Sequence, residues 1–142
     1  MSLTTERKIP LLSEVALFDG IGPDGLAMIA ERAIEVDFPE GRSIVRQGEV
    51  GTGFFLVTEG AARVVRDGKT IAEYGPGDFF GELSLLDGGP RIASVVATAP
   101  TKCLAIASWD FEALLESQPR LAIAILKGVA RRLRAMSDEH RH

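Results

Sequence analysis

The sequence has very little cysteine and histidine, which removes several kinds of chemistry. Its one cysteine, Cys103, has no partner for a disulfide within the chain and lies in an apolar run, where a buried thiol is expected. The two histidines, His140 and His142, stand among the last three residues. Nothing else in the chain offers a histidine for a metal site or for a Ser-His-Asp arrangement. We therefore expect no metal, no cofactor and no enzymatic activity.

Long apolar runs and positive charge are scarce as well. No stretch approaches the roughly 20 apolar residues that are needed to span a bilayer. The N-terminus carries no apolar segment of the kind found in signal peptides. The net charge of −4 and the pI of about 5.2 disfavour a general affinity for nucleic acid or for anionic membranes. We expect a cytoplasmic chain that by itself binds neither nucleic acid nor membrane.

The length and the apolar content fit a single folded domain. The chain has 142 residues, of which 46% are apolar, enough for a hydrophobic core without disulfides or metals. We expect one domain over residues 1–142, with a flexible polar segment at 1–8 and helices within 9–33. The second of these helices is expected to be capped by Asp24 and to run through Ala33.

Residues 34–107 show the pattern of a β-roll. Short apolar segments recur there, and each ends at a turn that contains glycine. Asp67-Gly68 between two such segments is a strong hairpin signal. Many short strands with evenly spaced turns favour a sandwich or a small barrel such as a jelly roll. The fold class that we predict is therefore mainly β with flanking helices: a β-roll of the jelly-roll type with N-terminal helices, a short helix after Gly81 and two C-terminal helices.

Two helices are expected within residues 108–142. Ser108 is expected to be the N-cap of the first, and Pro119 to begin the second, which runs to about residue 136. Apolar positions of the second helix form a heptad-like seam. We favour packing of this seam on the protein's own roll slightly over a homodimer, and both can hold because a helix has two sides. The seam consists of Ala122, Leu126, Val129, Leu133 and Met136.

The strand pattern breaks between residues 79 and 94, and this segment carries the candidate site. Gly81 precedes a stretch, 82–86, that is long enough for one helical turn, whose free backbone N–H groups can bind an anion. Gly81 also lets a ligand approach the backbone closely. Arg91 opens the next strand and offers a planar fork of donors that matches phosphate oxygens. The segment therefore predicts a phosphate-bearing ligand.

Glu82, at the start of the same short helix, narrows the kind of ligand. A carboxylate there would repel a phosphate unless a sugar hydroxyl gave it a partner, so the arrangement favours a ribose phosphate over free phosphate. The alternative is that Glu82 and Arg91 form a surface ion pair worth less than about 1 kcal/mol, while the glycines serve only turns. The ligand hypothesis accounts for all these residues at once, and we adopt it.

The same segment resembles a known family. Residues 80–86 read FGELSLL and residues 90–94 read PRIAS. These segments resemble the phosphate-binding cassette of cyclic-nucleotide-binding domains, which occur in the catabolite activator protein, in protein kinase A regulatory subunits and in cyclic-nucleotide-gated channels. The resemblance covers nearly the whole chain, from the helices near Leu12 to the final helix.

The resemblance implies a role for each residue of the site. Arg91 would bind the cyclic phosphate, and Glu82 would accept a hydrogen bond from the ribose 2′-OH. The final helix would act as a lid over the base. The remaining ligand-binding residues are Gly81, Leu83, Ser84, Ile92 and Ala93 in the cassette, with backbone N–H groups of Leu83, Ser84 and Ile92 on the phosphate, and Val64 and Ile71 beside the base or sugar.

Two departures from the family pattern bear on the ligand. Ser84 stands where the family commonly has alanine, which a backbone contact tolerates. Ile92 stands where guanine-preferring members often carry threonine, and without that hydroxyl a syn guanine loses a hydrogen-bond partner. We therefore expect cAMP rather than cGMP.

The function expected from these observations is a cyclic nucleotide sensor, a regulatory module without catalytic activity of its own. The alternative is the ligand-binding part of a transcription regulator or larger signalling protein whose effector domain is absent from this chain. A cupin-like enzyme is disfavoured because no histidine lies within residues 34–107. A degenerate fold kept only for dimerisation leaves Glu82 and Arg91 unexplained.

Overall fold

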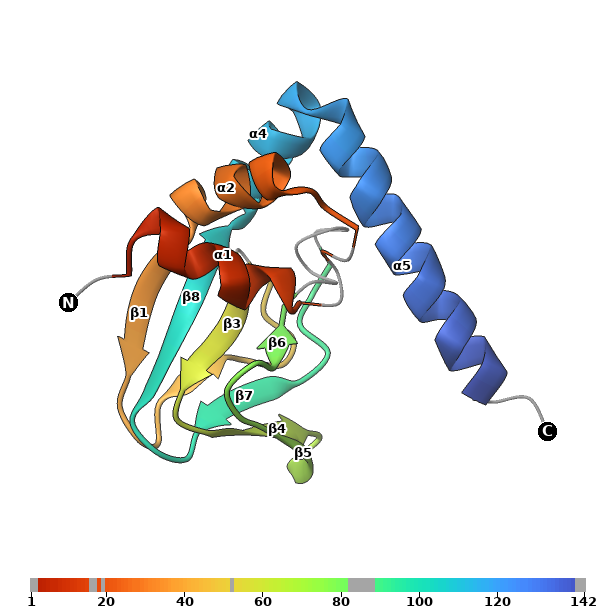
Figure 1. The fold of residues 1–142 in the computed structure, drawn as a ribbon. Coiled ribbons are helices and arrows are strands. Elements are labelled where there is room, and N and C mark those ends of the chain that lie inside the picture. Colours follow the sequence, from red (N-terminus) through yellow and green to blue (C-terminus); the bar gives the residue numbers. More distant parts are fainter. Residues whose placement is uncertain (1–2, 16–17, 19, 52, 82–88, 140–142) are drawn as a thin grey trace.

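Two antiparallel sheets of four strands form the body of the protein (Figure 1). The structure is a computed structural model that describes residues 3–15, 18, 20–51, 53–81 and 89–139. The strand order is β1-β8-β3-β6 in the first sheet and β2-β7-β4-β5 in the second. The strands are β1 (Ile34–Phe38), β2 (Ser43–Val45), β3 (Gly53–Glu59), β4 (Ala62–Arg66), β5 (Lys69–Tyr74), β6 (Phe79–Phe80), β7 (Ser94–Ala97) and β8 (Thr101–Ala107).

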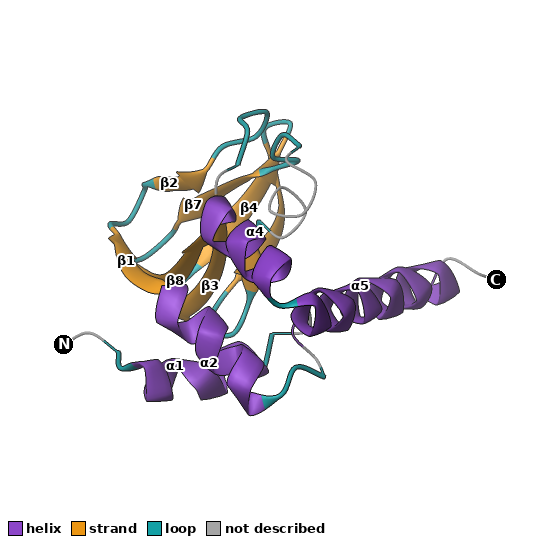
Figure 2. Ribbon diagram, turned by 90° about the horizontal axis from the view of Figure 1, so that it is seen from above, coloured by secondary structure: helices purple, strands orange, loops and turns teal. Residues whose placement is uncertain are grey.

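Helices precede and follow the roll. α1 (Thr5–Ser13) and α2 (Pro23–Arg32) lie across one end of it, and α4 (Ser108–Ser117) continues directly from β8 beside them. α5 (Pro119–Glu139) points away from the roll in both views (Figures 1 and 2). This arrangement confirms the predicted β-roll with N-terminal and C-terminal helices; the predicted short helix after Gly81 lies outside the described residues.

The central strands of the first sheet, β3 and β8, are buried on both faces because each face packs on a different cluster of side chains. Phe54 and Leu56 of β3 and Ile106 of β8 belong to a cluster shared with the helices. Val57 of β3 and Cys103 of β8 point the other way, into a second cluster between the two sheets. A strand with two buried faces reads as a nearly continuous apolar run, which explains the segment from Gly53 to Val57.

The hairpin predicted at Asp67-Gly68 is confirmed. Asp67 has φ 52° and Gly68 has φ 80°, and Arg66 pairs with Lys69 across them. Positive φ at both central residues is the requirement of a type I′ turn, whose twist matches that of the flanking strands. The turn therefore sets the register of β4 against β5, the strands that carry Val64 and Ile71.

The expectation of a flexible segment at 1–8 is wrong for residues 5–8, because α1 begins at Thr5. The side chain of Thr4 caps this helix by accepting a hydrogen bond from the backbone of Arg7 at 3.3 Å. Lys8 then ties α1 to the end of α2, since its Nζ donates to the carbonyl of Ala33 at 2.6 Å. A cation at this end of α2 also complements the helix dipole.

Two predicted N-caps are wrong, although the helices themselves are present. α2 begins at Pro23, and its N-cap is Gly22, so Asp24 lies inside the first turn. α4 begins at Ser108, and its N-cap is Ala107, with no side-chain capping bond. Proline at the first helical position supplies a preset φ and lacks only an N–H that would be unpaired there, so α2 can begin without a capping side chain.

The seam predicted on α5 packs on the protein only in part, since Val129 lies against the cluster shared with the N-terminal helices. Leu121 and Ile125, which lie outside the seam, are buried apolar side chains of α5, and they belong to the same cluster. Leu126 and Leu133, both in the predicted seam, are 67% and 60% exposed. The preferred expectation, that the seam packs on its own roll, is therefore wrong for these two leucines. The start of α5 at Pro119 is confirmed.

The helices that the structure describes are α1, α2, α4 and α5. None of them, within the part of the chain that the structure describes, combines the necessary length with the necessary apolar character.

Candidate functional site

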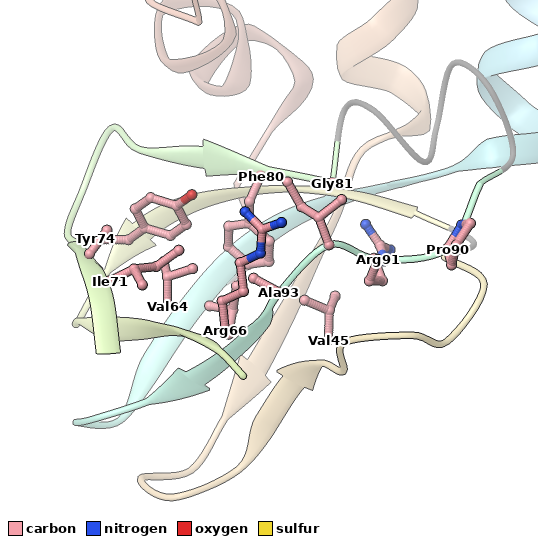
Figure 3. A pocket seen from close by; sticks show the side chains of 13 residues that line it. Val45, Val64, Arg66, Ile71, Tyr74, Phe80, Gly81, Pro90, Arg91 and Ala93 are labelled. Carbon is pink, nitrogen blue, oxygen red and sulfur yellow. The ribbon is translucent and has the colours of Figure 1, made fainter. Parts of the chain in front are cut away.

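A pocket of about 190 Å³ opens on the second sheet, and the segment before β7 forms its far end (Figure 3). This volume admits a ligand much larger than a water molecule, whose share of liquid volume is about 30 Å³. One end is apolar and the other carries a buried guanidinium. The residues that line it are Val45, Val64, Arg66, Ile71, Ala72, Tyr74, Phe80, Gly81, Pro90, Arg91, Ile92, Ala93 and Val95.

Arg91 is the buried cation of this pocket, with 8% of its surface exposed. Its backbone N–H donates to the carbonyl of Glu49 at 2.8 Å, and its carbonyl accepts from the N–H of Gly48 at 2.8 Å. Its Nη2 donates to the carbonyl of Gly53 at 2.7 Å. Both the backbone and the guanidinium are therefore fixed by one upstream segment, residues 48–53. A side chain held this way can meet an anion without first losing conformational freedom.

Two glycines make room for the Arg91 side chain. A Cβ atom at Gly51 would collide with Nε and Cζ of Arg91, and one at Gly81 would collide with its Nη1. A Cβ at Gly81 would also lie 2.7 Å from the carbonyl oxygen of Gly53. Gly81 has φ +91°, a conformation that favours glycine. From the sequence, Gly81 was interpreted as a position where a ligand approaches the backbone closely. The structure shows that the Arg91 guanidinium already occupies the space that a Cβ atom at Gly81 would take.

Aromatic rings form the floor at the apolar end. The ring of Phe80 stacks on Tyr74, with centroids 5.5 Å apart, and on Phe55, with centroids 5.3 Å apart. Ile71 and Ile92 stand at the rim, 57% and 61% exposed. Exposed isoleucines beside a stacked aromatic floor offer apolar surface that a flat ring system can cover.

The structure brings together six of the nine residues that the sequence nominated. Glu82, Leu83 and Ser84 lie outside the described residues, so their roles stay predictions. Arg91 is buried, which contradicts the alternative of a plain surface ion pair for this arginine. The six residues that line the pocket are Val64, Ile71, Gly81, Arg91, Ile92 and Ala93.

Sequence reasoning missed the residues that support Arg91 and the second arginine of the pocket. Gly51 and Gly53 approach the guanidinium from more than 35 positions upstream, as the Arg91–Gly53 bond with a separation of 38 shows. The glycine spacing of residues 48–53 was visible, but nothing local tied it to Arg91. Arg66 lies next to the Asp67-Gly68 hairpin, and nothing in the local sequence pattern marked it as a pocket residue.

The final helix does not cover the pocket. None of the described residues of α4 or α5 is among those that line it. Figure 1 shows why: α5 starts beside α4 and points away from the roll, and Leu121 and Ile125 pack its first turns on the cluster shared with the N-terminal helices. The lid implied by the resemblance is thus absent from this conformation.

Among the residues with described positions, no three His, Cys, Asp or Glu side chains gather closely enough to hold a metal ion.

The chain belongs to the cyclic nucleotide-binding domain family, because the model of that family matches residues 35–118. The match includes both sheets and α4, and it spans the whole pocket. This confirms the resemblance seen in the cassette segments.

Named relatives carry the same domain in different settings. The chain is 37% identical over 123 residues to the "Cyclic AMP receptor protein" of Thermus thermophilus, covering 83% of this chain and 57% of that protein. It is 38% identical over 116 residues to a "Cyclic nucleotide-gated potassium channel" of Mesorhizobium japonicum, covering 82% of this chain and 32% of the channel. The chain therefore spans less than two thirds of the length of each of these relatives.

A solved structure agrees with the fold. The N-terminal domain of a transcriptional regulator from Streptomyces coelicolor superposes with a TM-score of 0.78 at 35% identity. The match covers 87% of this chain and 90% of that one.

Proposed function

We propose that this chain senses cAMP by binding its cyclic phosphate at Arg91 and its adenine over the apolar end of the pocket. The observation that carries the proposal is a buried, pre-positioned guanidinium at one end of a pocket whose other end is aromatic and aliphatic. A phosphate pairs with a guanidinium fork through charge-assisted hydrogen bonds. A purine needs flat apolar contact, which Ile71, Tyr74 and Phe80 offer.

The residues outside the described ranges complete this proposal. Glu82 accepts from the ribose 2′-OH, and the backbone N–H groups of Leu83 and Ser84 join that of Ile92 on the phosphate. Each hydrogen bond to a charged group adds about 1.5–3 kcal/mol. Two or three such bonds with apolar burial reach about −8 kcal/mol, a micromolar Kd.

Calorimetric titration of the chain with cAMP and cGMP tests the proposal. We expect a Kd near micromolar for cAMP and a weaker one for cGMP, since Ile92 has no hydroxyl for a syn guanine. Arg91→Ala removes the phosphate partner and should weaken cAMP by about a hundredfold or more. Arg91→Lys keeps the charge but lacks the planar pair of donors, so its affinity for cAMP should lie between those of the original chain and of Arg91→Ala.

Arg63→Ala is the matched control, because Arg63 is an exposed arginine of β4 that does not line the pocket. Absence of heat and of any thermal shift at millimolar cAMP and cGMP would contradict the function. An Arg91→Ala variant that binds cAMP as well as the original chain would contradict the role of Arg91.

The output of binding is part of the same proposal. We propose a regulatory module without catalytic activity, in which α5 closes over bound ligand and so reports occupancy. Ligand shifts this equilibrium only if it binds the closed state better. Support comes from the relatives, a receptor protein and a channel, in which the matched domain is one part of a longer chain. A cytoplasmic location stays a prediction.

The second candidate is the ligand-binding part of a transcription regulator or another larger signalling protein. The coverage of 57% of the Thermus thermophilus protein favours it. The acidic net charge of −4 speaks against DNA binding by this chain itself. A gel-shift assay with duplex DNA checks this: we expect no shift, and specific binding by the chain alone would overturn the expectation.

A homodimer through α5 is the partner that we propose besides the ligand. Ile123, Leu126 and Leu133 are more than half exposed on a helix whose other face is buried. Their spacing of three and seven residues puts them on one stripe. Apolar stripes of this kind are stabilised when a second copy covers them.

A further inference from the structure

The pocket contains a second arginine that the proposed phosphate contact leaves unused. Among the described residues that line the pocket, Arg66 and Arg91 are the charged ones. Arg66 is exposed, whereas Arg91 is buried, so the two cations differ in how firmly they are held. The guanidinium of Arg66 makes no hydrogen bond or ion pair with any described residue. A ligand in the pocket can therefore reach it, because Arg66 is exposed.

The sheet register places Arg66 between the two ends of the pocket. On β4, Val64 pairs with Val95 and Val65 pairs with Ser94 of β7, so Arg66 comes level with the residues just before Ser94. Val64 and Arg66 are two residues apart and share a face of the strand. Figure 3 shows the same order, with Arg66 between the Ile71–Tyr74 end and Arg91. A ligand that reaches from Arg91 to Tyr74 must pass Arg66.

Purine bases differ in what they offer to such a guanidinium. Guanine and hypoxanthine present two adjacent acceptors, O6 and N7, which a guanidinium can meet with two parallel hydrogen bonds. Adenine presents N7 as an acceptor but carries a donor amino group at position 6. A guanidinium can therefore form only one of the two hydrogen bonds with adenine, because its second N–H would face another donor. A guanidinium within reach of the base is thus a discriminating group.

We propose that Arg66 reads the base of the bound nucleotide and favours purines with a 6-oxo group. This inference rests on the proposed function, because it needs a cyclic purine nucleotide in the pocket. Arg66 and Ile92 then have opposite effects on the affinity for a guanine nucleotide. Ile92 has no hydroxyl to accept a hydrogen bond from the 2-amino group, whereas Arg66 donates hydrogen bonds to the 6-oxo side. The chain accordingly binds cGMP better than Ile92 alone would allow.

The test compares cAMP, cGMP and 3′,5′-cyclic inosine monophosphate by calorimetry on the original chain and on Arg66→Leu. Cyclic inosine monophosphate carries the 6-oxo group without the 2-amino group, so it separates the effect of Arg66 from that of Ile92. We expect Arg66→Leu to weaken cGMP and cyclic inosine monophosphate by roughly fivefold or more while cAMP changes by less than about twofold. Arg66→Lys keeps the charge without the fork and should lose most of the same discrimination.

Arg63→Leu is the matched control, since it removes the same charge from the same strand on the opposite face, where Arg63 Nη1 contacts Thr70 Oγ1 at 3.5 Å. Equal weakening of all three nucleotides by Arg66→Leu would overturn the inference, because it would assign Arg66 to the phosphate. No change with any nucleotide would overturn it as well, and in both cases the proposed function stands if the original chain binds cAMP. Failure of the original chain to bind any of the three nucleotides would overturn the proposed function and this inference together.

Discussion

At the scale of single residues, the position of the Arg91 guanidinium depends on two neighbours that have no side chain. Its guanidinium lies against the Cα atoms of Gly51 and Gly81, and any side chain there would have to displace it. Displacement would also break the 2.7 Å bond from Nη2 to the carbonyl of Gly53. These glycines therefore fix the position of Arg91.

We expect Gly51→Ala to weaken cAMP binding by about tenfold or more, because loss of one good charge-assisted hydrogen bond costs about 1.5–3 kcal/mol. Calorimetry measures the change, and circular dichroism checks that the fold is kept. Gly75→Ala is the control, since a Cβ atom at Gly75 meets nothing within 4 Å. Unchanged affinity in a folded Gly51→Ala protein would show that Arg91 can move without loss.

Cys103 gives a second prediction at the residue scale. Burial raises the pKa of its thiol to about 12, from an ordinary value of 9.0. Because the folded pKa is the higher one, the thiol's contribution to stability is complete below about pH 9 and is lost as the pH rises toward 12, where the unfolded chain has already released the proton.

Urea unfolding at about pH 8 and about pH 10.5, on the original chain and on Cys103→Ala, measures this contribution. We expect the original chain to lose roughly 2 kcal/mol more than the variant between these two pH values, at about 1.4 kcal/mol per unit above the unfolded pKa. Equal losses in both proteins would contradict a raised pKa at Cys103.

At the scale of elements, α5 shows what a periodic pattern can and cannot predict. The sequence predicted the helix and its start at Pro119 correctly, since proline placement and apolar spacing are local signals. It did not predict which apolar face would be buried, because both Leu121–Ile125 and Leu126–Leu133 have helical spacing. That choice depends on where the N-terminal helices place their own apolar side chains, which is a tertiary property.

The exposed stripe of α5 predicts an effect on assembly. We expect the original chain to sediment as a dimer and Leu126→Glu to sediment as a monomer, because burial of each leucine contributes about 1.5–3 kcal/mol and a buried charge would cost more. Analytical ultracentrifugation with and without cAMP measures both. Lys127→Glu, an exposed position of the same helix outside the stripe, should stay dimeric. A monomeric original chain at tens of micromolar would contradict the proposed interface.

At the scale of the whole molecule, the fold class was predictable because glycines mark the turns within residues 34–107, as at Asp67-Gly68. The cassette was predictable for a similar reason: Gly81 and Arg91 stand close together in a recognisable segment. What could not be predicted was the support of Arg91 by Glu49 and Gly53, since no local rule links positions so far apart.

The clamp on Arg91 also decides whether the site can be transplanted. The carbonyl of Glu49, the N–H of Gly48 and the carbonyl of Gly53 hold the arginine from a different part of the chain. A designer who grafts residues 80–94 onto another scaffold would move the arginine without its clamp. The smallest portable unit of this site is therefore two segments of the chain, 48–53 and 80–94, held at their native spacing.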